Sequence, residues 1–149
     1  MHSGDDALPY MDKALPDAWK AAGAFAAVVS KETAKHGLTL AESEIVKVRV
    51  SQLNGCVFCL DLHSRQARKL GVPQQKLDLL PAWREATLFS SRETALLAVA
   101  EAATELPLSE NSKADLLAAR NALGEETFVS AELVAASINL FNRISILSE

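Results

Sequence analysis

The stretch Thr39–Gly55, TLAESEIVKVRVSQLNG, fits two secondary structures that exclude each other. Thr39 and Glu42 have the spacing of a capping box, which begins a helix. The run VKVRV instead alternates apolar and polar residues, as a half-buried strand does. A strand that led into Asn-Gly and then into a CxxC helix would open a thioredoxin-like unit. The remainder of the chain therefore decides the fold.

The remainder of the chain favours the helix. No second segment of the sequence shows comparable alternation of β-branched residues, and a lone strand cannot satisfy its backbone N–H and C=O groups. We predict an all-α, single-domain helical bundle of about six to seven helices, with the CxxC pair at a helix N-terminus. Residues 1–14 are predicted to be an arm with little structure of its own. The predicted helical segments are residues 16–36, 39–54, 56–70, 73–81, 90–106, 109–123 and 125–149.

The composition describes one globular domain over residues 1–149. Hydrophobic residues make up 49% of the chain, and a formal charge of -4 is spread along its length. No basic stripe or polybasic run indicates a nucleic acid or an anionic membrane as partner. No apolar segment approaches the ~20 residues of a membrane span, and the N-terminus lacks the charge pattern of a signal peptide. We expect a soluble cytoplasmic protein.

The predicted helices carry more apolar surface than one small bundle covers. Alanines are frequent and aromatic residues make up only 5% of the chain, so we expect the helices to approach one another closely. Apolar faces that remain uncovered in a single copy indicate contact between copies. The sequence therefore predicts a homo-oligomer.

The two cysteines, Cys56 and Cys59, are followed four residues later by His63. A helix turns by about 100° per residue, so these three side chains share one face. Cys56 is expected in the first turn, where free N–H groups stabilise a thiolate, and His63 lies one turn beyond Cys59 and can accept its proton. In a reducing cytoplasm such a pair is expected to be catalytic or metal-binding rather than a permanent structural disulfide. The motif predicts thiol chemistry.

Zinc binding is the main alternative for this motif. Its two cysteines and its histidine are good zinc ligands, and Glu44 or Asp61 would add an oxygen ligand. Structural zinc sites usually combine two ligand pairs on separate elements, whereas this sequence has no second cluster of cysteines or histidines. The other two histidines, His2 and His36, have no ligand spacing to a cysteine. Zinc is therefore the weaker interpretation.

Together these residues resemble the alkylhydroperoxidase D / carboxymuconolactone decarboxylase family of small all-helical proteins. The peroxidase branch of that family carries a glutamate, then a CxxC pair, then a histidine four residues after the second cysteine. The same pattern falls here on Glu44, Cys56, Cys59 and His63, with the glutamate twelve residues before the first cysteine. The similarity covers most of the chain, from about residue 39 to residue 146.

The resemblance implies an all-α fold of the alkylhydroperoxidase D type, assembly into trimers or hexamers, and antioxidant reduction of organic hydroperoxides by thiols. It implies that Cys59 attacks the peroxide and that Cys56 closes the disulfide. Glu44 would draw the proton through His63, with no bound cofactor or metal. The electrons would come from an external thiol reductant, such as a lipoyl group on a partner protein or a peroxiredoxin-type redox protein.

One position departs from the family pattern. Members closest to the characterised peroxidase have a histidine just before the second cysteine, where this chain has Phe58. An apolar ring there removes a donor from the site and favours a raised thiol pKa by desolvation. A thiol-disulfide oxidoreductase or redox sensor on the same scaffold, and a non-enzymatic zinc-binding module, are therefore kept as alternatives. Lactone decarboxylation is disfavoured because decarboxylase members lack the CxxC pair. Trp83, Arg84, Asn142 and Arg143 are interpreted as packing residues.

Overall fold

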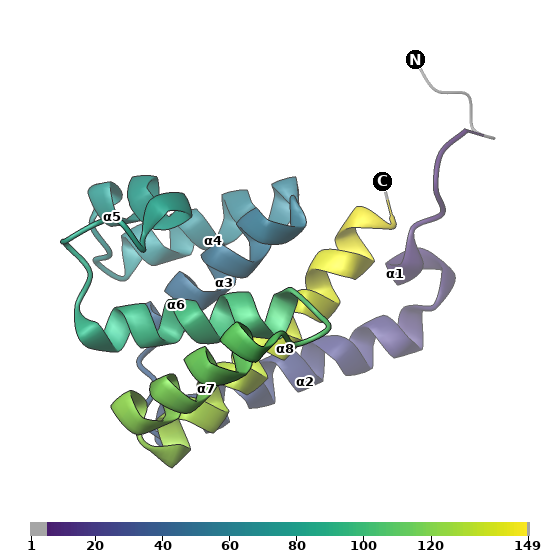
Figure 1. Cartoon of the computed structure of the whole chain (residues 1–149). Helices are drawn as coiled ribbons and strands as arrows, with labels where there is room; N and C mark the ends of the chain where they lie inside the picture. The colour runs from purple at the N-terminus through teal and green to yellow at the C-terminus, as the bar shows by residue number, and fades with distance from the viewer. Residues whose placement is uncertain (1–5, 149) are drawn as a thin grey trace.

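The computed structural model describes residues 6–148, and every regular element in this range is a helix (Figure 1). This finding confirms the predicted all-α class. No helix among these residues is long and apolar enough to cross a lipid bilayer. Residues 1–5, which include His2, and residue 149 lie outside the described part. The elements are α1 (Met11–Ala14), α2 (Pro16–Lys35), α3 (Leu40–Asn54), α4 (Val57–Lys69), α5 (Gln74–Leu79), the 3-10 turn η1 (Leu80–Ala82), α6 (Ser91–Thr104), α7 (Glu110–Leu123) and α8 (Glu125–Ile146).

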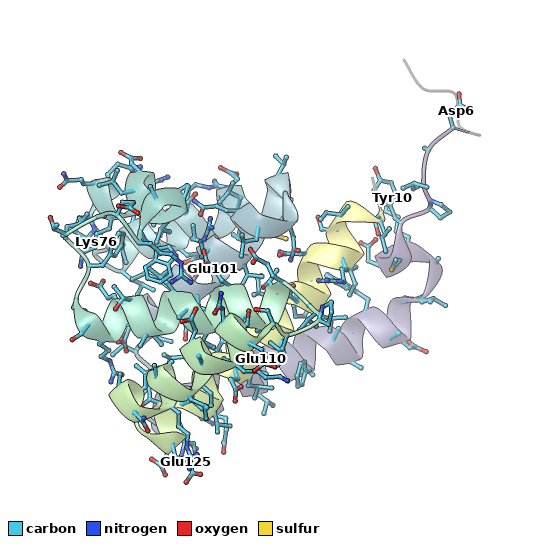
Figure 2. All side chains as sticks on the ribbon, viewed as in Figure 1. Asp6, Tyr10, Lys76, Glu101, Glu110 and Glu125 are labelled. Carbon is cyan, nitrogen blue, oxygen red and sulfur yellow. The ribbon has the colours of Figure 1, made fainter. Side chains whose placement is uncertain are left out.

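The described range holds eight α-helices, one more than the seven predicted segments, because part of the N-terminal arm is ordered as α1. The Met11 N–H donates a hydrogen bond of 3.2 Å to Ser148 Oγ, just beyond α8. Figure 2 shows Tyr10 beside the C-terminal turns of α8. The arm is therefore held by a contact with the end of α8 as well as by its packing against α2. Such a contact is not visible in the local sequence of the arm.

Helix α3 resolves the conflict between capping box and strand in favour of the helix. The Glu42 N–H donates to Thr39 Oγ1 at 3.1 Å, and the Thr39 N–H donates to Glu42 Oε1 at 3.0 Å. Both halves of the predicted capping box are therefore formed, and they satisfy N–H groups that the first turn of a helix leaves without partners. The same pair of bonds begins α6 at Ser90 and Glu93.

The strand-like alternation of valines arises because α3 is buried on two sides. Val46 and Val50 belong to a core cluster shared with α2, α6, α7 and α8. Ile45 and Val48 belong to a second cluster shared with α4, α5 and α6. Residues three or four apart lie on one face of a helix, so two apolar faces interleave along the sequence. Helix α3 is thus central, and it packs against α4, α6 and α8.

Glu101 of α6 connects α3 to the turn that follows α5 (Figure 2). It accepts hydrogen bonds from Arg49 Nη2 at 2.8 Å and from Trp83 Nε1 at 3.0 Å. The Arg84 guanidinium lies 4.3 Å from the centre of the Trp83 ring. Trp83 is buried, so these contacts agree with the packing role expected of Trp83 and Arg84.

Candidate active site

A tight turn between α3 and α4 places the two cysteines. Gly55 ends α3 with a φ of 70°, in the left-handed region that glycine adopts without steric cost. The chain then turns so that Cys56 becomes the N-cap of α4 and its sulfur accepts the Cys59 N–H at 3.4 Å. Cys56 therefore lies one position before the first helical turn in which it was expected. The CxxC pair stands at the helix N-terminus, as predicted.

The two cysteines are free thiols with their sulfur atoms in direct contact. The Cys56 thiol donates to Cys59 Sγ over 2.6 Å. Cys56 is 0% exposed and Cys59 is 4% exposed. Side chains three residues apart on one helical turn are close enough to form a disulfide with little movement of the backbone. The pair can therefore cycle between dithiol and disulfide inside the protein.

Burial raises the pKa of the Cys59 thiol from 9.0 to about 11, and the close Cys56 sulfur adds to the rise because two negative sulfurs in contact repel each other. The side chains of Asn142 and Ser145 act in the opposite direction but do not offset these effects. The direction agrees with the desolvation expected at this motif, although Phe58 itself is 66% exposed. Cys59 is therefore a protonated thiol at neutral pH, and a nearby base is needed to convert it to a nucleophile.

Glu44 and His63 lie in contact where α3 packs against α4, and together they could act as such a base. Glu44 Oε2 lies 2.8 Å from His63 Nδ1, and both side chains are largely buried. Lys47 Nζ lies 3.5 Å from the other carboxylate oxygen of Glu44. Lys47 was not predicted, although its i, i+3 spacing from Glu44 is a signal that sequence analysis can use. Glu44 is thus held between a histidine and a lysine and is largely buried.

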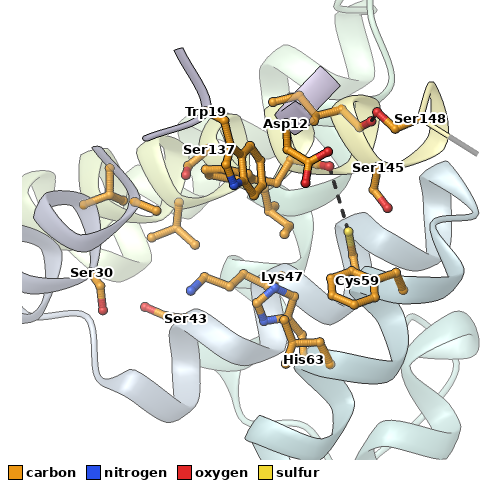
Figure 3. A pocket seen from close by; sticks show the side chains of 18 of the residues that line it. Asp12, Trp19, Ser30, Ser43, Lys47, Cys59, His63, Ser137, Ser145 and Ser148 are labelled. Carbon is orange, nitrogen blue, oxygen red and sulfur yellow. Dashed lines mark hydrogen bonds between the residues drawn. The ribbon is translucent and has the colours of Figure 1, made fainter. Parts of the chain in front are cut away.

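A cavity of about 650 Å³ connects His63 to one of the two sulfurs (Figure 3). Cys59 and His63 line it, whereas Cys56 is not among its lining residues. Within the described residues, no direct hydrogen bond joins His63 to either cysteine. A proton would therefore pass between Cys59 and His63 through a water molecule or a bound substrate. The geometry makes Cys59 the accessible thiol and Cys56 the hidden one.

A buried amide network beneath the cysteines was not predicted as part of the site. Asn54 Nδ2 donates at 2.9 Å to the side-chain oxygens of both Asn139 and Asn142. Asn142 Nδ2 donates in turn to Ser51 Oγ at 3.1 Å. These bonds join the last turn of α3, directly before the CxxC turn, to α8. Asn142 is 0% exposed, and its buried amide forms hydrogen bonds to both Asn54 and Ser51, in addition to the packing that was expected.

We expect Asn142→Ala to lower the free energy of unfolding by about 1–3 kcal/mol, because it leaves the buried Ser51 hydroxyl and an Asn54 amide hydrogen without a partner. Urea unfolding monitored by circular dichroism measures the change. Asn121→Ala on the exposed face of α7 is the matched control, and we expect it to stay within about 0.5 kcal/mol of wild type. Equal stability of the two variants would contradict a structural role for the network.

The raised pKa of Cys59 predicts an unusual pH dependence of thiol alkylation. A thiol with a pKa near 9 reaches its maximal alkylation rate soon above that pH, whereas in the folded protein the rate at Cys59 should keep rising until about pH 11. At pH 7 the thiolate fraction is then about 100-fold lower than that of a thiol with pKa 9. Iodoacetamide labelling read by peptide mass spectrometry measures this profile, with the urea-unfolded chain as control. A plateau below pH 9 in the folded protein would refute it.

The other ionisable residues considered from the sequence lie elsewhere. Asp61, which was considered as a zinc ligand, is exposed and pairs with Arg65 at 2.8 Å. His36 lies at the end of α2, between Glu32 and Glu126. Among residues 6–148, no group of three or more histidine, cysteine, aspartate or glutamate side chains is placed to hold a metal ion.

Fold and site together define a small all-helical protein with a buried CxxC dithiol beside a glutamate–histidine pair. The model of the carboxymuconolactone decarboxylase family matches residues 18–102. Over 118 residues, 79% of this chain and 80% of the relative, the sequence is 36% identical to the uncharacterised protein YdfG of Bacillus subtilis. The chain belongs to the carboxymuconolactone decarboxylase family, as its motif predicted.

Two further proteins are similar to this chain, one over a shorter stretch of sequence and one in its solved structure. The uncharacterised protein YnjA of Escherichia coli is 35% identical over 63 residues, which are 42% of this chain and 35% of YnjA. A crystal structure from Agrobacterium tumefaciens matches with a TM-score of 0.79 and 30% identity, over 94% of this chain and 93% of the other. That protein is of unknown function and is considered a candidate antioxidant defence protein AhpD. The match confirms the alkylhydroperoxidase D-like fold.

Proposed function

We propose that this protein is a thiol peroxidase that reduces organic hydroperoxides through a Cys56/Cys59 dithiol–disulfide cycle and serves antioxidant defence in the cytoplasm. The observation that carries the proposal is the asymmetry of the two thiols. Cys59 lines a cavity that the Glu44–His63 pair adjoins, and Cys56 lies behind it in contact with its sulfur. A peroxide entering the cavity therefore meets one thiol first and finds the second ready to form the disulfide.

The first step converts Cys59 to a sulfenic acid. His63 takes the thiol proton through a water or the substrate, and the Glu44 carboxylate stabilises the resulting imidazolium. The Cys59 thiolate attacks the terminal oxygen of the hydroperoxide, and the O–O bond breaks. The departing alkoxide takes the proton from His63 and leaves as an alcohol. Cys59 is oxidised to the sulfenic acid while the peroxide is reduced.

The second step closes the disulfide. Cys56 loses its proton and attacks the Cys59 sulfur, with which it is already in contact. The S–S bond forms as the S–O bond breaks, and the hydroxide takes up the Cys56 proton and leaves as water. In sum, one hydroperoxide and two thiols yield one alcohol, one water and one disulfide.

An external dithiol returns the disulfide to the reduced state. A lipoyl group on the flexible arm of a partner protein is narrow enough to reach a buried pair of cysteines, and here Cys56 is 0% and Cys59 is 4% exposed. A peroxiredoxin-type redox protein is the other reductant proposed. Exposed apolar side chains along α2, including Trp19, Phe25 and Val28, support a homo-oligomer. The family resemblance is the basis for proposing a trimer or hexamer.

The alternative functions find less support in this geometry. Exchange with protein disulfides requires a sulfur that a bulky partner can approach, whereas both cysteines are buried. A zinc-binding module would require its metal in stoichiometric amount, so elemental analysis of protein purified without chelator tests that function directly.

The proposed peroxidase is tested by supplying reduced protein with cumene hydroperoxide and dihydrolipoamide. We expect one dihydrolipoamide to be oxidised for each hydroperoxide consumed, and turnover to exceed that of a Cys56→Ser/Cys59→Ser double variant. We expect the double variant to keep the fold, because serine is close to cysteine in size, and circular dichroism checks this. Consumption no faster than in that variant would disprove the proposal. Reduction of a protein disulfide with no consumption of hydroperoxide would favour the oxidoreductase instead.

A further inference from the structure

Helix α8 supplies a carbonyl and a hydroxyl group beside the sulfur of Cys59. The Cys59 thiol points to the main-chain carbonyl of Phe141, with 4.0 Å between the sulfur and the oxygen. Ser145 lies one turn further along α8 and lines the same cavity as Cys59. Figure 3 shows Ser145 next to Cys59, with its hydroxyl on the side of the sulfur. Both groups therefore face the atom that reacts in the proposed cycle.

These two groups act in opposite ways on a charged sulfur. The Phe141 oxygen accepts a hydrogen bond from a protonated thiol, but its partial negative charge repels a thiolate. A serine hydroxyl can instead donate to a thiolate, because its hydrogen rotates about the Cβ–Oγ bond. In the structure the protonated thiol is directed to Phe141, and no full hydrogen bond joins it to Ser145. Loss of the thiol proton breaks the contact with Phe141 and leaves Ser145 placed to donate.

The other donors near this sulfur are committed elsewhere or lie behind it. Ser148 lines the cavity too, but its hydroxyl donates to a carbonyl of its own helix at 2.6 Å. The Asn142 amide is fully buried and is not among the cavity-lining groups. The Cys56 thiol donates to Cys59 over 2.6 Å, yet it must give up its own proton in the second step. Ser145 is thus the donor on the cavity side that can keep its proton throughout the cycle.

A donor matters at this position because the surroundings of Cys59 otherwise disfavour its thiolate. Burial raises the pKa of Cys59 and the close Cys56 sulfur adds to the rise, whereas the side chains of Asn142 and Ser145 lower it. A hydrogen bond to an ionised group is roughly twice as strong as one between neutral groups. The contribution of Ser145 is therefore greatest at the moment when the sulfur carries its charge.

We propose that the Ser145 hydroxyl donates a hydrogen bond to the Cys59 thiolate as His63 removes the thiol proton, and that Ser145 is a catalytic residue of the first step. This inference rests on the proposed peroxidase and adds a residue to its site. Ser145 forms no covalent bond and keeps its own proton. The negative charge moves from the Cys59 sulfur to the departing oxygen of the hydroperoxide, which takes its proton from His63.

Two serines of α8 allow a matched test. Ser145 and Ser137 both line the cavity, but eight helical positions, about 12 Å, separate them. We expect Ser145→Ala to lower kcat/KM for cumene hydroperoxide about tenfold, because a hydrogen bond to a charged group is lost. Alkylation of Cys59 by iodoacetamide at pH 8 should slow about threefold, since the remaining thiolate, with its higher pKa, is a better nucleophile. Ser137→Ala should change neither rate. Ser145→Thr keeps a hydroxyl and should stay within about twofold of wild type in both.

Alkylation needs no peroxide, so it separates this inference from the peroxidase itself. Slower alkylation in Ser145→Ala, in a protein whose wild type consumes no hydroperoxide, would support the donor and refute the peroxidase. Wild-type turnover, with equal kcat/KM and equal alkylation in Ser145→Ala and Ser137→Ala, would overturn the donor and leave the peroxidase intact. Equal losses in Ser145→Ala and Ser145→Thr would also overturn it, because they would come from packing rather than from the hydroxyl. Alanine favours a helix, so we expect Ser145→Ala to fold, and urea unfolding checks this.

Discussion

Cys59→Ser is expected to abolish hydroperoxide reduction, with a loss of about 10³-fold or more in kcat/KM. Cys59 is the sulfur that lines the cavity, and a serine hydroxyl in its place cannot form the sulfenic acid on which the cycle depends. The measurement is steady-state consumption of cumene hydroperoxide with dihydrolipoamide as reductant. The size of the loss follows from removal of the nucleophile rather than of a group that assists it.

Cys56→Ser is the matched control, because it removes the neighbouring sulfur and keeps the nucleophile. This variant should consume one equivalent of hydroperoxide per chain and then stop, with a sulfenic acid at Cys59 that dimedone can trap. If Cys56→Ser turned over normally, or if dimedone labelled Cys56 in Cys59→Ser, the roles of the two thiols would be reversed.

Glu44→Gln is expected to lower kcat/KM at pH 7 by about 10²–10³-fold. Glutamine preserves the shape of the side chain but cannot stabilise a protonated His63, to which Glu44 is bonded at 2.8 Å. Because burial raises the pKa of Cys59 to about 11, the thiol cannot ionise unaided at neutral pH. In the variant, Cys59 can lose its proton only to hydroxide, so kcat/KM should rise steeply towards pH 11. The kcat/KM of wild type should rise less over the same range.

The pH profile separates a role in proton transfer from a structural role, because a variant that is merely misfolded would not recover at high pH. Glu32→Gln is the matched control. Glu32 contacts His36 at 3.3 Å in an exposed pair at the end of α2, away from the cysteines. It should leave both the rate and the profile unchanged. A parallel loss at all pH values in Glu44→Gln would contradict the relay.

Local signals in the sequence were sufficient for most of the helices. The capping boxes at Thr39 and Ser90 and the glycine stop at Gly55 depend on residues a few positions apart, and all three are formed in the structure. The alternating valines of α3 were the misleading signal, since they reflect burial against two different clusters. A helix with two apolar faces has no single amphipathic period, and only the positions of its neighbours reveal this.

Site residues that are close in the sequence could be predicted, whereas those that come from distant helices could not. The cysteines and His63 lie within eight positions of each other, so their shared helix could be predicted. The family pattern then identified Glu44, which the structure brings to His63. The partners from α8 could not be found in this way. Asn139 and Asn142 reach Asn54 across more than eighty positions, and an asparagine in a helix carries no sign of its distant partner.

The Asn54–Gly55 turn is also a sequence at which deamidation is expected. Asparagine followed by glycine loses ammonia readily, because the glycine nitrogen attacks the side-chain carbonyl to form a succinimide. Here the Asn54 amide is held on α8 by two bonds of 2.9 Å, and the Gly55 N–H donates to the Gln52 carbonyl at 3.2 Å. Both reacting groups are thus restrained while the fold is intact. Deamidation would replace a donor with a carboxylate facing two amide oxygens, directly before Cys56. The rate of deamidation at Asn54 should therefore depend on how often the contact between α3 and α8 opens.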